Sequence, residues 1–112
     1  EKVLPEQGGK IGKKIWDFCA GDKISSSPCI AEGFIYFGSS DKKLYCLNAR
    51  TGVKSWEFET GGDIWSRPCI VNGLIYFGSN DRKLYCLDTG RAGTIGGNPI
   101  NVKQFRPTFV PR

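Results

Sequence analysis

The sequence contains no histidine and no methionine, and it has no long hydrophobic run. Without histidine, Ser–His and Cys–His catalytic pairs are excluded within this chain. Because no CxxC pair is present either, an ordinary zinc site is also excluded. No stretch approaches the roughly 18 apolar residues of a membrane-spanning helix. The opening residues, EKVLPEQGGK, include neither an initiator Met nor the apolar core of a signal peptide. The chain could therefore be a fragment, a processed form or a trimmed one.

Cysteine is present but sparse, and its pattern does not suit a disulfide framework. The count is five, which is odd, and no two cysteines form a CxxC pair or stand next to each other. Four of them (Cys29, Cys46, Cys69 and Cys86) lie inside short apolar runs, so we expect reduced thiols buried in a core. Reduced thiols favour a cytoplasmic setting, whereas a periplasmic or extracellular one stays open.

The charge is mildly basic. Sixteen Lys and Arg residues against eleven Asp and Glu give a net charge of +5, and no run of five basic residues occurs. We expect these charges to solubilise turns and sheet edges, and nucleic acid is not a predicted partner.

A direct repeat dominates the sequence. Residues 12–47 align with residues 52–87 without a gap, and 22 of the 36 positions are identical. A period of about 40 residues is typical of propeller blades. Runs rich in Ile, Tyr, Phe and Leu alternate with turn sequences such as SNDRK, and no segment has convincing helical periodicity. The sequence therefore predicts an all-β fold of antiparallel four-stranded β-propeller blades, with two blades' worth of strands.

The expected strands follow a fixed order in each unit. They span 24–31, 34–39, 43–48 and 53–59 in the first unit and 64–71, 74–79 and 83–88 in the second, with an isolated fourth-strand sequence at 13–19. The predicted organisation is an N-terminal lead (1–11), two repeats (12–51 and 52–91) and an irregular C-terminal tail (92–112). The second repeat lacks a typical outer strand, for which 100–106 of the tail could substitute.

The segment LYCLNARTGVKSWEF, residues 44–58, strongly resembles the repeat of pyrroloquinoline-quinone-type β-propellers. GKKIWDF at 12–18 matches half of that motif, and the resemblance covers about residues 9–90. It implies that the fourth-strand tryptophan docks between blades on the glycine-bearing turn of the next motif. Trp16 and Trp56, with Gly12 and Gly52, would take this structural role.

The resemblance implies binding more than catalysis. Quinoprotein dehydrogenases of this family use calcium, a stacking Trp, a catalytic Asp and a disulfide between adjacent cysteines. In this sequence no two cysteines are adjacent, no calcium loop is found, and the Asp residues mostly lie in predicted turns. Non-enzymatic relatives include outer-membrane assembly lipoproteins and kinase sensor domains. We therefore expect a protein-interaction scaffold without catalysis, cofactor or metal. The alternatives are blades of a quinone-dependent dehydrogenase, or a ligand-binding propeller; a binder of acidic polymers is a third hypothesis.

Candidate binding residues come from positions where the two repeats differ. ISSSPCI in the first repeat becomes IWSRPCI in the second, so Trp65 and Arg67 replace Ser25 and Ser27. Alternation places each pair on one side of the innermost strand. An aromatic ring beside a guanidinium suits a planar anion or an acidic segment of a partner. The alternative is structural: Trp65 packs between blades and Arg67 pairs with Asp63.

Two blades cannot close a ring, because propellers need typically four to eight blades. The chain is therefore a fragment of a longer propeller, a module that pairs with another protein, or one that associates with itself. Self-association has a sequence basis, since residues 13–19 of one copy could complete the blade at 64–88 of the next, head to tail.

Overall fold

The computed structural model describes residues 11–90, together with the backbone of 94–95 and 98–99. These residues contain strands and turns, and no helix that could cross a bilayer. The first sheet has the order β1 (Cys29–Ala31), β2 (Phe34–Gly38), β3 (Lys43–Asn48) and β4 (Lys54–Glu59). The second has the order β5 (Cys69–Val71), β6 (Leu74–Gly78) and β7 (Leu84–Asp88). All neighbouring strands are antiparallel, as predicted.

The two sheets are built in the same register. Cys29 pairs with Tyr36 in the first sheet, and Cys69 pairs with Tyr76 in the second. A two-residue turn with positive φ at both positions joins the first two strands of each sheet: Glu32-Gly33 in one and Asn72-Gly73 in the other. This is the turn whose twist matches that of a hairpin. The sequence repeat is therefore a structural repeat.

The innermost strands are shorter than predicted. Instead of 24–31 and 64–71, the ladders begin at Cys29 and Cys69. The preceding Pro has no N–H to donate to a ladder. In the first sheet, the amides of Ser25 and Ser26 both donate to the Gly38 carbonyl, and the Ser26 hydroxyl accepts from the Gly38 amide at 2.7 Å. This side-chain bond replaces regular strand pairing.

The prediction of a strand at 13–19 is wrong for the chain as the structure describes it. No β-ladder forms there among residues 11–90, because the strand that would pair with this segment is not among them. The alternation expected of a strand is nevertheless present. Trp16 and Phe18 are half-buried against the first sheet, whereas Ile15 and Asp17 are exposed.

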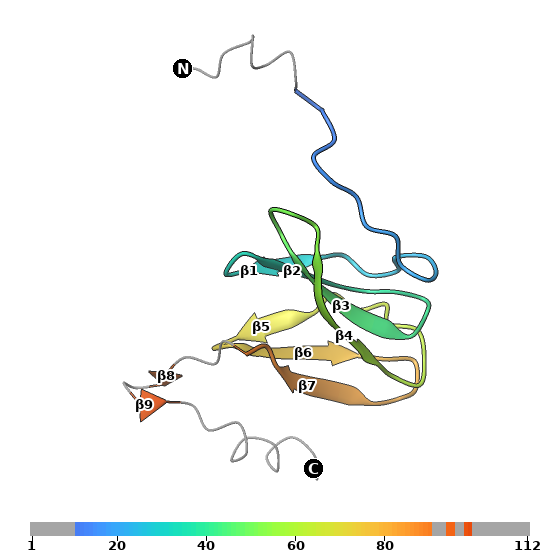
Figure 1. Ribbon diagram of the computed structural model, residues 1–112. Coiled ribbons are helices and arrows are strands. Elements are labelled where there is room, and N and C mark those ends of the chain that lie inside the picture. Colours follow the sequence, from blue (N-terminus) through green and yellow to red (C-terminus); the bar gives the residue numbers. More distant parts are fainter. Residues whose placement is uncertain (1–10, 91–93, 96–97, 100–112) are drawn as a thin grey trace.

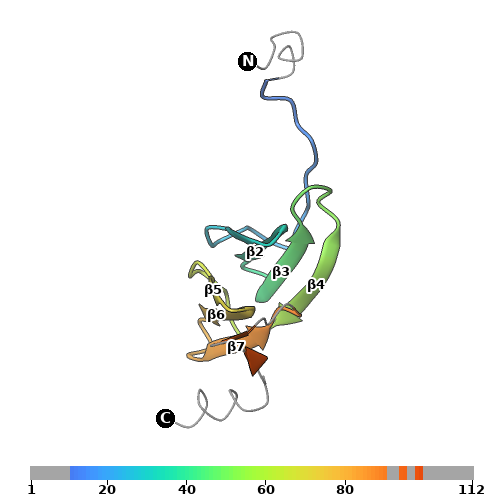
Figure 2. The same ribbon diagram turned by 90° about the vertical axis from the view of Figure 1, so that its left-hand side faces the viewer.

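The core lies between the two sheets, which stack face to face (Figures 1 and 2). Tyr36, Leu44 and Cys46 of the first sheet meet Ile75 and Phe77 of the second. Phe58 on β4 contacts Tyr85 edge to face, with centroids 5.6 Å apart. A second cluster, centred on Phe37, Tyr45 and Leu47, lies on the opposite face of the first sheet, beneath residues 12–20, which we call the leading segment.

The C-terminal part contains a two-stranded sheet, β8 (Thr94–Ile95) with β9 (Asn98–Pro99). The substitute outer strand predicted at 100–106 lies outside the described residues, as do the first ten residues of the predicted lead.

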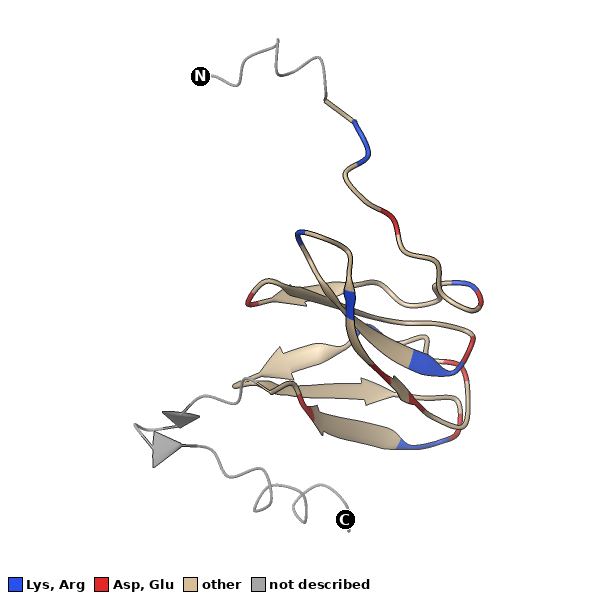
Figure 3. Ribbon diagram, viewed as in Figure 1, with Lys and Arg blue, Asp and Glu red and all other residues tan. Residues whose placement is uncertain are grey.

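All five thiols are free, as expected. The expected burial of Cys29, Cys46, Cys69 and Cys86 is found only in part. Cys46 is buried, Cys29 and Cys86 are half-buried, and Cys69 and Cys19 are exposed. Cys46 is covered because the second sheet packs over it. Cys86 occupies the equivalent place on the outer face of the second sheet, which no further sheet covers among the described residues. Figure 3 shows charged residues in the turns, in the leading segment and along β4.

Candidate protein-interaction site

In each sheet, an aspartate in the turn between the second and third strands anchors the loop that precedes the first strand. Asp41, between β2 and β3, accepts hydrogen bonds from the amides of Gly21 and Lys43, each at 3.0 Å, and from the Tyr45 hydroxyl. Burial alone would raise the pKa of Asp41, but these hydrogen bonds, that of Tyr45 foremost, outweigh burial and lower the pKa. The anchored loop contains Asp22, which follows Gly21 directly.

The second sheet repeats this arrangement. Asp81 accepts from the amides of Gly61 and Lys83, each at 2.9 Å, and from the Tyr85 hydroxyl at 2.5 Å. The Tyr85 hydrogen bond lowers the pKa of Asp81 against the opposing effect of burial. The same bond, with burial, raises the pKa of Tyr85 to about 12. The loop before Asp63 is thereby held by a hydrogen bond equivalent to the one that holds the loop before Asp22.

The two anchored loops enclose a groove at the start of the innermost strands, with a volume of about 500 Å³. Trp65 lies at its edge with 61% of its surface exposed. The groove is lined by this indole, by Ile24 and by polar side chains: Asp22, Lys23, Ser25, Ser40 and Asp63. An exposed aromatic ring beside carboxylates, an ammonium group and hydroxyls can bind a polypeptide segment of mixed polarity.

The structure brings together only half of the predicted binding residues. Trp65 and Ser25 line this groove, whereas Ser27 and Arg67 do not and lie exposed farther along the chain. The structural alternative for Arg67 does not occur either. Among residues 11–90 the ion pairs are Lys14–Asp17, Lys43–Glu57 and Lys54–Glu57, so Arg67 does not pair with Asp63. Ser25 is partly structural, because its hydroxyl donates to the Ile64 carbonyl at 2.8 Å.

Sequence reasoning missed Lys23 and Asp63. These two residues are equivalent in the repeat, and the charge at this position changes sign between them. The rule that singled out Trp65, a difference between repeats, also applies to this position. The missed signal was therefore available one residue before each predicted innermost strand.

The predicted tryptophan docking is observed once. Trp16 packs on Gly52, where an added Cβ would lie 2.5 Å from ring atoms Cδ2 and Cε3. Its Nε1 donates to the Ala49 carbonyl at 3.0 Å. Trp56 packs against Tyr36 and borders a pocket of about 430 Å³ beside Leu87 and Gly90. Gly12 has nothing within 4 Å of the Cβ position among the atoms described.

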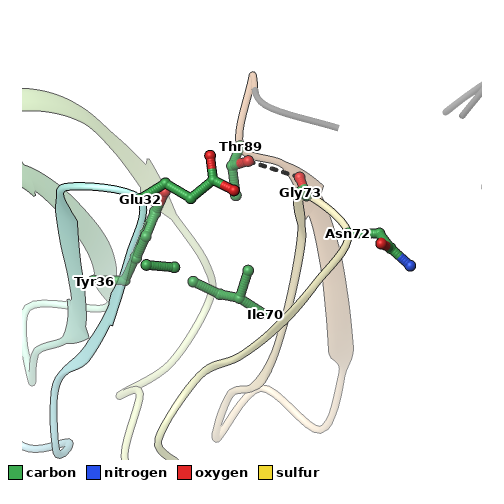
Figure 4. Close-up of a pocket in the computed structure, with 7 residues that line it drawn as sticks. Glu32, Tyr36, Ile70, Asn72, Gly73 and Thr89 are labelled. Atoms are coloured by element: carbon green, nitrogen blue, oxygen red, sulfur yellow. Dashed lines mark hydrogen bonds between the residues drawn. The ribbon is translucent and has the colours of Figure 1, made fainter. Parts of the chain in front are cut away.

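A further cleft of about 300 Å³ lies at the other end of the innermost strands, between the two hairpin turns (Figure 4). Glu32 and Tyr36 form one wall, and Ile70 and Asn72 belong to the other. The Thr89 hydroxyl donates to the Gly73 carbonyl at 2.7 Å across its rim. This contact uses the Thr89 hydroxyl and the Gly73 carbonyl within the fold.

The described residues do not fit a calcium-bound quinone. They contain no group of three or more His, Cys, Asp or Glu residues placed to hold a metal ion. All five cysteines are free, and none is adjacent to another. The donor atoms that quinoprotein dehydrogenases of this type bring together are therefore not assembled here.

Comparisons with known proteins agree with this architecture. The sequence profile described as outer membrane protein assembly factor BamB matches residues 8–94. BamB from Moraxella catarrhalis aligns with a TM-score of 0.62 and 24% identity, over 69% of this chain and 24% of that one. This chain therefore spans about a quarter of the length of that protein. No curated protein sequence matches the chain significantly.

Two other solved structures share the fold. The computationally designed Ika4 protein aligns with a TM-score of 0.52 and 11% identity, over 58% of this chain and 40% of that one. A europium-containing methanol dehydrogenase aligns with a TM-score of 0.52 and 16% identity, over 67% of this chain and 14% of that one. The two sheets are thus blades of a β-propeller, the second of them with three strands among the described residues.

Proposed function

Because this chain belongs to the pyrroloquinoline-quinone-type propeller-repeat family described as outer membrane protein assembly factor BamB, we propose that it is a protein-interaction module without catalysis of its own. The observation that supports this function is the groove at the start of the innermost strands, edged by exposed Trp65. Large exposed aromatic side chains are enriched where proteins bind one another.

The groove favours an extended polypeptide segment as its ligand. Trp65 offers an apolar face, which also attracts cations, and Asp22 and Asp63 offer carboxylates beside it. We therefore propose that the bound segment carries a basic or apolar side chain that stacks on the indole. Lys23 and the serine hydroxyls of the groove would bind its backbone carbonyls.

A displayed library of random peptides tests this function on the purified chain. The selected peptides should bind the wild type and lose at least tenfold in affinity to Trp65→Ser, which introduces the residue found at the equivalent position of the first repeat. Val53→Lys is the matched control, because Val53 is 64% exposed away from the groove and its repeat equivalent is Lys13. Equal binding by the Trp65→Ser variant would refute the groove as the binding site.

The dehydrogenase alternative is tested separately. If the proposed function is right, mixing the chain with pyrroloquinoline quinone and calcium should leave the absorbance spectrum of the quinone unchanged. The unfolding midpoint of the chain should not shift either. A shift in either quantity would support a quinone-binding propeller instead.

A second copy of the chain is the other protein partner that we propose. It would dock through surfaces that do not include Trp65.

A further inference from the structure

Identical residues are buried in the first blade and exposed in the second. Leu44 on β3 is fully buried beneath the second sheet, whereas its repeat equivalent, Leu84 on β7, is 78% exposed. Tyr36 and Cys46 are fully buried, whereas Tyr76 and Cys86 are only partly buried. The outer face of the second sheet therefore carries the same apolar residues as a face that a blade covers within this chain.

The opposite end of the molecule exposes the complementary residues. Ile64, fully buried, seats on the first sheet so closely that a Cβ added at Gly38 would lie 2.6 Å from its Cβ. Its equivalent Ile24 is 53% exposed, and at Gly78, the equivalent of Gly38, the nearest atom to an added Cβ is the Ser66 hydroxyl oxygen at 3.7 Å. An exposed isoleucine and an open glycine site thus lie at opposite ends of one chain.

The contact between a tryptophan and a glycine-bearing turn is likewise made at only one of its two repeat positions. Trp16 fills the site at Gly52, but the equivalent site at Gly12 is open. Trp56, the equivalent of Trp16, borders a pocket beside Gly90, but no described atom lies within 4 Å of the Cβ position of that glycine. The φ angles of Gly12 and Gly52, 82° and 76°, are nearly equal, so Gly12 already has the backbone conformation that the contact uses.

The outer edge of β7 also differs from that of its repeat equivalent. Its equivalent, β3, pairs with β4, and Lys43 on β3 forms an ion pair with Glu57 on β4 at 2.9 Å. No strand pairs with the outer edge of β7 in the part of the chain that the structure describes. The leading segment carries the equivalents of β4, including the Lys14–Asp17 ion pair at 2.8 Å, which corresponds to Lys54–Glu57 at 2.7 Å.

We propose that these two ends are the halves of one head-to-tail interface between copies of this chain. Residues 12–19 of one copy lie along β7 of the next, in the register of β4 on β3. In that register Phe18 lies opposite Leu84 and Asp17 reaches Lys83, as Phe58 lies opposite Leu44 and Glu57 reaches Lys43. Ile24 seats on Gly78 of the neighbour, and Trp56 of that neighbour docks on Gly12.

The contact is heterologous, so copies add in one direction until a ring closes. Each copy supplies two blades, and propellers have typically four to eight, so a closed ring contains about two to four copies. This interface does not include Trp65 itself, although it shares Ile24 with the lining of the groove.

Mixing two blocked variants of the full chain tests the interface. Gly78→Ala blocks the acceptor face, and it has room in the single chain because the nearest atom to its new methyl would be 3.7 Å away. Ile24→Asp blocks the donor end at a side chain that is already half exposed. Light scattering should find the wild type at about two to four times 12.4 kDa. Each variant alone should be a folded monomer, and an equal mixture should form a one-to-one dimer through the remaining intact pair of surfaces.

Ile15→Ser is the matched control, since Ile15 lies on the outward side of the leading segment and its repeat equivalent is Ser55. It should assemble like the wild type. A monomeric wild type would overturn the proposal and show that another segment or partner covers the face. Blocked variants that assemble normally, or a mixture that stays monomeric, would overturn it as well. Peptide binding by the monomeric Gly78→Ala variant, whose substitution lies outside the groove lining, would still report on the Trp65 groove, so the two proposals can fail separately.

Discussion

The Trp16 indole packs on Gly52 so closely that a Cβ at position 52 would lie 2.5 Å from its ring atoms. Gly52→Ala should therefore destabilise the chain by about 2–4 kcal/mol, the sum of left-handed backbone strain and overpacking. Urea unfolding of the Gly78→Ala background, in which we expect copies to stay apart, measures this loss. Gly12→Ala is the control with similar backbone strain and no neighbouring ring. Equal losses from both substitutions would contradict the docking.

The two hairpin turns permit a reciprocal exchange. Glu32 and Asn72 occupy equivalent positions with φ of 53° and 52°, a conformation that Asn tolerates better than Glu. Glu32→Asn should stabilise the chain by about 1 kcal/mol, and Asn72→Glu should destabilise it by a similar amount. Denaturant midpoints of the two variants provide the measurement. Shifts of the same sign would show that the turn conformation does not determine the difference.

How much of this could be predicted depends on the residues concerned. The repeat of 40 residues predicted the sheets, and the resemblance to the propeller-repeat family predicted the Trp16–Gly52 contact. It could not predict where the innermost strands begin, since the Ser26 hydroxyl competes with the backbone for Gly38. Nor could it predict the exposure of Cys69, because equivalent residues have different neighbours at the two ends of a short repeat array.

The groove was predicted only in part, for a similar reason. Trp65 and Ser25 were identified because the repeats differ there, and both line the groove. Arg67 is also a difference between repeats, but it lies beyond the groove. Which of these differing positions face one cavity depends on loops that Asp41 and Asp81 anchor over long sequence distances, such as Gly21 to Asp41. No local pattern encodes that placement.

The Asp81–Tyr85 pair gives stability that depends on pH at both extremes. The folded pKa of Asp81 is lower than its ordinary value of 3.8, so its contribution is present above about pH 4 and is lost as the pH falls through the folded pKa. The pKa of Tyr85 is raised from 10.0 to about 12, so its contribution is complete below pH 10 and is lost as the pH rises through 12.

Urea midpoints across pH check this dependence. Tyr85→Phe removes the hydrogen bond that shifts both groups, so its stability should fall less steeply than that of the wild type at either extreme. An unchanged pH profile in the Tyr85→Phe variant would show that the pair does not contribute.

Protein binding at the groove is the central claim, and the three indole N–H resonances of the chain test it most directly. Trp16 donates its indole N–H to Ala49 within the fold, whereas Trp65 is 61% exposed at the groove. A peptide selected against the chain should shift the Trp65 indole resonance strongly during an NMR titration and leave the Trp16 resonance in place. A saturable titration in which the Trp65 resonance does not move would contradict the account.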